Sequence, residues 1–443
     1  MARQMKDSSV DWIGKIPEEW EVCKLKKLIS FINGYPFDSS VMGDEGNCSV
    51  VRIGDLQNNA VAYDTALKVE YHDELSNYLI RNDDILIAMS GATVGKFAIV
   101  NNITKSACVN QRVGIIRSNI SGYLKYILAS SGFSSYITLL SEGTAQPNIS
   151  TTNINNFSIC IPPPAETQII IAYLDTKCAE IDKVVEQTRA TIEEYKKLKQ
   201  AIITEAVTKG LDSSVPMKDS GVEYLGCIPR GWSIISIGQA FVYVGGFAFK
   251  SELFTITESN YQVLRIGNVK NDNLILENKQ IYIDESCAET AKVAEVRTDD
   301  ILFTMTGTKG KRDYFYTVRI EDGHIAEKRL FINQRVGLFR KKNKKIKMAF
   351  ANYLLKETRI LDYIFLSETG TANQGNLGIE TIARTKLYLP PLEEQEEICL
   401  YLDTKCAEID RIIEKKEQLI EELGSYKKSL IYEYVTGKKE VTA

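Results

Sequence analysis

The chain contains two copies of one succession of motifs, and this internal repeat limits the possible folds more than any other feature. The stretches of the first copy return in the same order: KDSSVDWIGKIPEEW (6–20) as KDSGVEYLGCIPRGW (218–232), DDILIAMSGATVGK (83–96) as DDILFTMTGTKGK (299–311), NQRVG (110–114) unchanged at 333–337, and YLDTKCAEID (173–182) unchanged at 401–410. The sequence therefore predicts two structural units of similar architecture.

The separation between matching stretches grows along the chain. It is 212 residues at the first match and 228 at the YLDTKCAEID match, so the second copy gains its extra residues before that segment. Each copy is therefore a globular part of variable length followed by a segment of fixed length. Two domains that bind different ligands, joined to helices that meet a common surface, would show this pattern.

The segment of fixed length has the periodicity of a helix. Apolar residues recur three or four positions apart in both copies, and a sustained repeat of this kind favours a left-handed coiled coil. Prolines at 162–164 and 390–391 predict where the helices begin, and Gly210 and Gly437 predict where they end. The expected seam residues are Ile181, Val185, Ile192, Tyr195 and Ile202 in the first helix, and Ile409, Ile413, Ile420, Leu423 and Leu430 in the second.

The short connection between the copies predicts that the two helices run antiparallel. Residues 209–217 reach only about 30 Å when fully extended, so the second globular part begins near the C-terminal end of the first helix. Polar residues interrupt both seams at matching positions. They predict a register in which Thr188 faces Lys427 and Lys199 faces Lys416.

These features together predict an α+β protein with two tandem α/β-type domains, each followed by a long helix, with the helices paired as an antiparallel coiled coil. The predicted segments are a first domain (1–161), a first helix (162–209), a linker (210–217), a second domain (218–389), a second helix (390–437) and a tail (438–443).

Composition excludes several classes of protein. Hydrophobic residues make up 44% and charged residues 25% of the chain, as in ordinary globular proteins. No apolar run approaches the ~18–20 residues that span a bilayer, and the start, MARQMKDSSVDW, lacks the apolar core of a secretory signal. We therefore expect a cytoplasmic protein with no membrane partner. Nine cysteines without a CxxC pair, and only two histidines, indicate reduced thiols and no zinc cluster.

No catalytic motif fits the chain. SGATVGK at 90–96 resembles a phosphate loop, but Gly91 and Gly95 enclose three residues instead of four, and Phe97 stands where Ser or Thr would bind magnesium. A strand at Ile85–Met89 that runs into a glycine-rich turn is the favoured interpretation, and Ile301–Met305 matches it. The alternative, a nucleotide hydrolase, predicts that Lys96→Ala abolishes nucleotide binding. Rossmann, nucleophile-elbow and amino-methyltransferase motifs do not occur.

The remaining polar residues in turns favour binding to nucleic acid, because Arg and Lys pair with guanine edges and phosphates, and Asn and Gln pair with adenine. The candidates in the first copy are Thr93, Lys96, Gln111, Arg112, Thr144, Gln146 and Asn148. Those in the second copy are Lys309, Lys311, Arg312, Gln334, Arg335, Thr371, Asn373 and Gln374.

Each group of candidates has an alternative interpretation. NQRVG is identical in both copies, which suits a scaffold or a phosphate contact, whereas the differing GTAQPN and GTANQG loops suit base recognition. The basic run at 340–345 is either a solvated cluster or a phosphate contact. Trp12, Trp20 and Trp232 stand beside IP turns and are expected in the core.

The motifs in combination resemble the specificity subunit of type I restriction–modification systems. The resemblance covers both repeats and rests on the tandem IP-x-x-W openings, the DDIL and NQRVG phrases, and the PP-x-x-EQ-to-YLDTKCAEID helices. It implies that each globular part is a target-recognition domain that reads one half of a bipartite, asymmetric DNA site. The first copy has PAETQ where the second has PLEEQ, which makes equal docking of the two helix starts doubtful.

The resemblance also implies partners and a division of labour. The paired helices would fix the length of the spacer, the DNA between the two half-sites that is not read. They would also dock the modification subunits, of which we expect two. These subunits would bind S-adenosylmethionine, and restriction subunits would use ATP and Mg²⁺. No catalytic residue or cofactor is expected on this chain. A coiled-coil assembly scaffold with two protein-binding end domains is the alternative, and it predicts no retention of double-stranded DNA.

Overall fold

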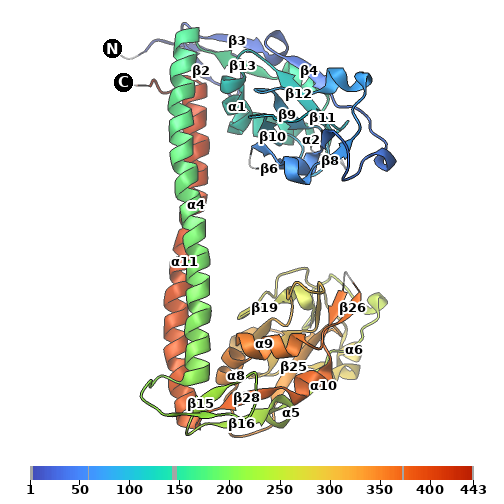
Figure 1. The fold of residues 1–443 in the computed structure, drawn as a ribbon, viewed down its shortest axis with the longest axis vertical. Coiled ribbons are helices and arrows are strands. Elements are labelled where there is room, and N and C mark those ends of the chain that lie inside the picture. Colours follow the sequence, from blue (N-terminus) through green and yellow to red (C-terminus); the bar gives the residue numbers. More distant parts are fainter. Residues whose placement is uncertain (1–2, 58, 142–146, 372–373, 442–443) are drawn as a thin grey trace. The chain divides into compact units, whose positions relative to one another are not determined.

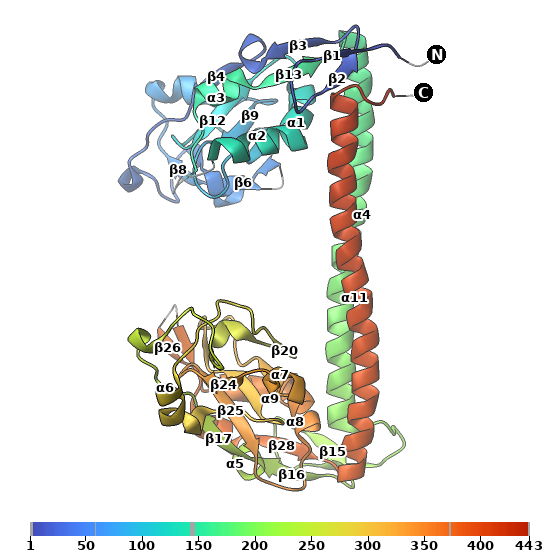
Figure 2. The same cartoon turned by 180° about the vertical axis from the view of Figure 1, so that it is seen from behind.

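The computed structural model describes residues 3–57, 59–141, 147–371 and 374–441. It divides into two compact units (Figures 1 and 2). Unit 1 comprises residues 1–189 and 416–443, and unit 2 comprises residues 190–415. Each unit contains one globular domain together with parts of both long helices, and both domains mix helices and strands, as the α+β prediction requires.

The globular domain of unit 1 is built on a mixed sheet in the strand order β4-β12-β9-β10-β7-β6, beside a smaller sheet in the order β11-β5-β8. Its strands and helices are β1 (Met5–Asp7), β2 (Lys15–Pro17), β3 (Glu21–Lys24), β4 (Ser30–Asn33), β5 (Cys48–Val51), β6 (Leu56–Gln57), β7 (Ala60–Val61), β8 (Leu67–Val69), β9 (Ile85–Ala88), β10 (Phe97–Ile99), β11 (Ala107–Val109), β12 (Val113–Arg117), α1 (Ser121–Ala129), α2 (Ser131–Ser141), α3 (Thr151–Asn156) and β13 (Ser158–Ile161).

Strand β9 is buried on both faces, which explains why the DDILIAM segment is apolar without alternation. Ile85 and Ile87 pack in one core with α1 and α2. Leu86 and Ala88 point the other way, into a second core shared with β5 and β11. Alternate side chains of one strand thus serve two hydrophobic layers.

The globular domain of unit 2 repeats this plan around the sheet β17-β25-β21-β23. Its strands and helices are β14 (Met217–Asp219), β15 (Cys227–Pro229), β16 (Ser233–Ser236), α5 (Ile237–Ala240), β17 (Phe241–Gly245), β18 (Tyr261–Leu264), β19 (Val269–Lys270), β20 (Asn273–Leu274), α6 (Glu285–Thr290), β21 (Ile301–Thr304), β22 (Thr306–Gly307), β23 (Thr317–Arg319), α7 (Asp322–Ile325), β24 (Arg329–Ile332), β25 (Val336–Lys341), α8 (Met348–Leu354), α9 (Thr358–Phe365), β26 (Thr369–Thr371), β27 (Gln374–Asn376), α10 (Ile379–Arg384) and β28 (Lys386–Leu389).

The repeated sequence opening forms the same local structure in both units. Strands β1 and β2 pair with Lys6 opposite Ile16, and β14 and β15 pair with Lys218 opposite Ile228. The next strand, β3 or β16, pairs antiparallel with the strand that leads into the long helix, β13 or β28. The beginning and the end of each domain are therefore joined at the base of its helix.

The tryptophans of this opening lie in the core, as predicted. Trp20 and Trp232 are 0% and 1% exposed. Trp12 is partly buried, stacks on Phe157 at 5.2 Å between ring centroids, and donates a hydrogen bond to the Ser158 carbonyl oxygen.

The two long helices are α4 (Pro164–Lys209) and α11 (Leu392–Val435), of 46 and 44 residues. Helix α4 begins at Pro164, one of the predicted prolines, and α11 begins at Leu392, directly after the predicted pair at 390–391. Gly210 and Gly437 follow their C-terminal ends with φ of +77° and +67°, a left-handed conformation that glycine adopts without strain. In the described part of the chain, no helix combines the length and apolarity needed to cross a bilayer.

The helices pair antiparallel within each unit and lie side by side in both views (Figures 1 and 2). In unit 1, Lys427 of α11 forms an ion pair with Asp182 at 2.6 Å, and Tyr434 packs against Tyr173 with ring centroids 4.6 Å apart. From Tyr173 to Asp182 along α4, the contacting residue on α11 goes back from Tyr434 to Lys427, so the two helices run in opposite directions. In unit 2, Lys199 pairs with Asp410 at 2.7 Å.

These ion pairs correct the predicted register. Lys427 was expected to face Thr188 and instead pairs with Asp182, six residues earlier. Lys199 was expected to face Lys416 and pairs with Asp410, also six residues earlier. The predicted register would place two like charges, Lys199 and Lys416, against each other, whereas in the structure each lysine has a carboxylate partner on the other helix. The prediction matched polar positions without requiring opposite charges.

The ten expected seam residues all lie away from the exposed surface. Four are buried: Ile181, Ile192, Ile409 and Leu430. The others are partly buried: Val185, Tyr195, Ile202, Ile413, Ile420 and Leu423.

Candidate nucleic-acid interface

In unit 1 the turn after β9 meets two other segments that carry predicted binding residues. Met89 donates its backbone N–H to the carbonyl of Arg112, and its own carbonyl accepts the N–H of Ile149, both at 2.9 Å. Ser90 forms a β-bridge with Asn148. Residues 89–96, 110–112 and 147–149, which are distant in sequence, therefore form one contiguous edge.

Unit 2 repeats this arrangement with different loops. Met305 donates its N–H to the carbonyl of Arg335 at 3.0 Å. Strand β22 pairs with β27, and β27 pairs with β26, so the turn after β21 joins a hairpin. In both units the loops with differing sequences thus stand beside the invariant NQRVG turn, and this edge is called the reading edge of each unit.

The described candidates are exposed. They are Thr93, Lys96, Gln111, Arg112 and Asn148 in unit 1, and Lys309, Lys311, Arg312, Gln334, Arg335, Thr371 and Gln374 in unit 2. Thr144, Gln146 and Asn373 lie outside the described residues.

The candidate cations differ in their surroundings. Arg312 forms an ion pair with Asp362, and Lys309 donates a hydrogen bond of 3.0 Å to the Gly370 carbonyl oxygen. Within the described ranges, the side chains of Arg112, Arg335 and Lys311 have no hydrogen-bond or ion-pair partner. An exposed guanidinium without an internal partner retains its full capacity for bidentate contacts.

The backbone of the NQRVG turn is held in place by close contacts in both units. A preceding strand crosses it at Gly34 in unit 1 and at Gly246 in unit 2, where an added Cβ would overlap the carbonyl oxygen of Asn110 or Asn333. Gln111 donates its backbone N–H to the Tyr35 carbonyl at 2.9 Å. The backbone of the turn is thereby fixed, while its Gln and Arg side chains remain exposed.

Sequence reasoning missed Glu368, which organises the reading edge of unit 2. Its carboxylate accepts hydrogen bonds from the Tyr314 hydroxyl at 2.7 Å and from the Gly310 N–H at 3.1 Å. Burial, together with this carboxylate, raises the pKa of Tyr314 above its usual value, so the phenol remains a donor. Glu368 therefore links the loop after β22 to the start of the hairpin.

Sequence reasoning also missed a buried ion pair in each unit, at the far end of the strand that leads to the reading edge. Asp84, 3% exposed, accepts a hydrogen bond of 2.8 Å from Nε of Arg117. Asp300, 1% exposed, accepts hydrogen bonds of 2.9 and 2.6 Å from Arg340. The repeated Asp-Asp pair before each ILxx strand is the signal that could have identified them. Arg340, the first residue of the basic run, is thus an internal partner and not a free phosphate ligand.

Chemically, the reading edges offer donors and acceptors on rigid backbone. No group of three His, Cys, Asp or Glu side chains in the described ranges is placed to hold a metal ion. The turn after β9 has Gly91 and Gly95 at φ of +84° and +81°, a strand-to-turn junction as predicted.

Comparison with known proteins identifies relatives over nearly the whole chain. The family described as type I restriction modification DNA specificity domain matches residues 17–194 and 229–422, one match in each repeat. The specificity subunit of the type I restriction enzyme MjaVIII from Methanocaldococcus jannaschii is 25% identical over 441 residues, covering 96% of this chain and 94% of that protein. The StySPI specificity subunit from Salmonella potsdam is 24% identical and covers 97% of this chain and 91% of that protein.

A solved structure has the same fold. A chain from a structural study of complex assembly and conformational transition of the type I R-M system matches with a TM-score of 0.66. The match is 15% identical and covers 96% of this chain and 99% of that chain.

Proposed function

Because the chain belongs to the family of type I restriction–modification DNA specificity subunits, it is the DNA-recognition subunit of such a system, and we propose that each domain reads one half of a bipartite, asymmetric target. Subunits of this family act with modification and restriction subunits, and the chain itself is not catalytic.

One observation carries the proposal. Both units hold the same buried scaffold, namely the Asp–Arg pair and the NQRVG turn, but present different loops beside it. A common scaffold with variable exposed Asn, Gln, Arg and Lys side chains is what two readers of different base sequences require. The exposed arginines Arg112 and Arg335 belong to the shared turn and not to the variable loops, so they are assigned a guanine contact common to the two half-sites, because a guanidinium binds guanine through two hydrogen bonds.

The remaining candidates support the two arginines. Gln111, Asn148, Gln334 and Gln374 offer amides to adenine, and Thr93, Thr371, Lys96 and Lys311 offer contacts to bases or phosphates. Arg312 and Lys309 position the loop through their internal bonds.

The long helices are proposed to set the spacer between the half-sites and to dock two modification subunits. S-adenosylmethionine would bind on the modification subunits, ATP and Mg²⁺ would bind on the restriction subunits, and the complex would work in the cytoplasm. An α-helix rises 1.5 Å per residue, so seven residues inserted into each helix add about 10 Å, or roughly three base pairs of DNA.

The experiment is to sequence methylated adenines in cells that carry the complex with altered specificity subunits. A heptad inserted into both helices should lengthen the spacer and leave both half-sites unchanged. Exchange of residues 218–389 for the corresponding domain of a relative should change one half-site and leave the spacer unchanged. A helix insertion that altered the half-sites would contradict the proposal.

A further inference from the structure

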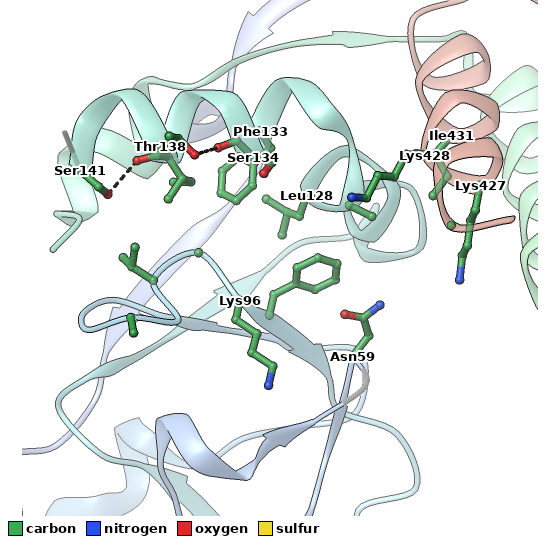
Figure 3. A pocket seen from close by; sticks show the side chains of 17 residues that line it. Asn59, Lys96, Leu128, Phe133, Ser134, Thr138, Ser141, Lys427, Lys428 and Ile431 are labelled. Atoms are coloured by element: carbon green, nitrogen blue, oxygen red, sulfur yellow. Dashed lines mark hydrogen bonds between the residues drawn. The ribbon is translucent and has the colours of Figure 1, made fainter. Parts of the chain in front are cut away.

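A groove of about 750 Å³ in unit 1 lies between the turn at 92–97, helix α2 and the last part of α11 (Figure 3). Its apolar lining includes Phe97, Leu128, Phe133 and Ile431, and its charged residues are Lys96, Lys427 and Lys428. None of the seventeen described residues that line the groove is acidic. The groove is thus cationic around an apolar floor.

Lys428 is a free positive charge on α11. Several helical lysines of this chain have a glutamate three or four residues away, as Lys177 has in Glu180. Around Lys428 these positions are Gly424, Ser425, Ile431 and Tyr432. Among the residues described, no hydrogen-bond or ion-pair partner reaches its side chain. In Figure 3 it extends from α11 toward Leu128.

The other two lysines differ from each other. Lys427 is held by Asp182 at 2.6 Å and is only 24% exposed, as its counterpart Lys199 is held by Asp410. Lys96 is exposed, has no side-chain partner within the described ranges, and lies across the groove from α2 (Figure 3). Two unneutralised ammonium groups, Lys96 and Lys428, therefore line one groove.

Unit 2 replaces the corresponding positions with an internal ion pair. Tyr126 donates a hydrogen bond to the aspartate of the YLD segment in unit 1, and Tyr353 donates one to the matching aspartate in unit 2. When the two tyrosines are aligned, Lys356 stands where unit 1 has Ala129. Asp272 occupies the same left-handed turn as Asn59. Lys356 is 7% exposed and forms an ion pair with Asp272.

The position of Lys428 differs in the same way. Its counterpart 228 residues earlier is Gln200, whose amide donates a hydrogen bond of 3.0 Å to the Lys356 carbonyl. In unit 2 the side chains at these positions thus have hydrogen-bond and ion-pair partners within the chain. In unit 1 the same positions line an open groove with two lysines, Lys96 and Lys428, that are unpaired within the described residues. The difference indicates an external anion in unit 1.

We infer that this groove binds the sugar–phosphate backbone of the DNA whose bases the adjoining reading edge contacts, with Lys428 and Lys96 each on a phosphate. The occupant is argued from charge complementarity and from continuity, because Lys96 ends the same turn that carries Thr93. The inference rests on the proposed function and adds a contact from a coiled-coil helix, present in the first unit only.

The test measures DNA affinity of the complex of this chain with its modification subunits, between about 50 and 200 mM salt. Each phosphate contact contributes roughly 0.9 to the slope of log K against log salt. Lys428→Gln should reduce the magnitude of the slope by about 0.9, and the double variant Lys96→Gln, Lys428→Gln by about twice as much. Cognate and non-cognate duplexes should weaken equally, because phosphates carry no base information.

Two further variants complete the test. Lys177→Gln, an exposed helical lysine of unit 1 paired with Glu180, is the matched control and should leave the slope unchanged. Gly424→Leu adds a side chain to the groove wall, where an added Cβ meets nothing within 4 Å. It should weaken DNA binding without lowering the melting temperature, because leucine favours the helix over glycine.

The outcomes separate this inference from the proposed function. If the unmodified complex binds no DNA, both fail. If it binds DNA and Lys428→Gln leaves the slope unchanged, the groove inference alone is overturned. If Lys428→Gln instead releases the modification subunits, the groove binds a protein, and the inference is likewise overturned.

Discussion

The indole N–H of Trp232 donates a hydrogen bond of 2.9 Å to Oε2 of Glu394 in the first turn of α11. Unit 1 repeats the contact between Trp20 and Glu166 at the same distance. The tryptophan of each IP-x-x-W opening is therefore tied to the beginning of the helix that ends the same copy. This contact joins the first and last elements of each domain.

The environment of Glu394 predicts a specific dependence of stability on pH. Burial raises the pKa of Glu394, although the Trp232 hydrogen bond opposes this. The folded protein then holds the proton to higher pH than the unfolded chain, so the free energy of unfolding falls as pH rises from the ordinary carboxyl range through the raised pKa. Glu394→Gln removes this titration, and its melting temperature should decline less between about pH 4 and 7. The exposed Glu393→Gln is the control, and parallel curves for all three proteins would refute the assignment.

The start of α11 is held by a buried glutamine at a position where the start of α4 has a threonine. Gln395 is 0% exposed, donates to the carbonyls of Lys345 and Pro390, and accepts the N–H of Lys347, each at 2.8 Å. Thr167 stands at the matching position, and its hydroxyl donates to the carbonyls of Pro162 and Pro163 just before its own helix. Gln395→Ala leaves buried polar groups unpaired, and we expect a loss of about 3 kcal/mol in unfolding free energy.

The matched variant Thr167→Ala should cost only about 1 kcal/mol, because one hydroxyl is lost and no partner outside the helix start is stranded. Denaturant unfolding monitored by circular dichroism measures both. Equal losses would contradict the different hydrogen-bond patterns of Gln395 and Thr167.

Neighbouring aspartates at 299 and 300 provide a test of burial. Asp300→Asn removes the charge that balances Arg340 in the interior and should cost about 3 kcal/mol. Asp299→Asn weakens a solvent-exposed pair with Arg319 and should cost roughly 0.5 kcal/mol, with its left-handed φ tolerated by asparagine. Thermal unfolding of the two variants separates them. Similar melting temperatures would show that the Asp300–Arg340 pair contributes no more than a surface pair.

Repeats and periodicity predicted most of the architecture. The apolar seam predicted α4 and α11, and the prolines and glycines at their ends predicted where they begin and end. The register was wrong because it depends on Asp182 and Asp410, which lie outside the apolar seam and were not considered. In the structure, Lys199 and Lys427 pair with these aspartates.

The reading edges were predicted only as separate turns. That Met89 and Met305 bring the NQRVG turn beside the variable loops depends on backbone hydrogen bonds between distant segments. Glu368 was missed because its role depends on Tyr314 and Gly310, which approach it only in the folded domain. Identity between the copies indicated the scaffold, but no comparable signal marks contacts that one copy alone contains.

Two glycines should respond to alanine in opposite directions. Gly424 lies inside α11, and an added Cβ there meets nothing within 4 Å, so Gly424→Ala should raise the unfolding free energy by about 1 kcal/mol. At Gly246 an added Cβ would overlap the Asn333 carbonyl, so Gly246→Ala must displace the NQRVG turn. Melting temperature should rise for the first variant and fall for the second. A neutral Gly246→Ala would show that the crossing is looser than the structure describes.

Arg335 should determine the second half-site and leave the first unaffected. Its guanidinium is exposed at the reading edge of unit 2 and has no side-chain partner in the described part of the chain. Loss of a bidentate contact to guanine costs about 1–3 kcal/mol of discrimination, so Arg335→Gln should relax one base position by roughly ten- to a hundredfold. Arg112→Gln should do the same in the first half-site only.

Arg384→Gln, a solvent-exposed helical arginine paired with Glu380, is the control. Sequencing of methylated adenines measures all three. If Arg335→Gln lowers methylation uniformly without relaxing any base, the residue contacts phosphate and the base-reading assignment is wrong.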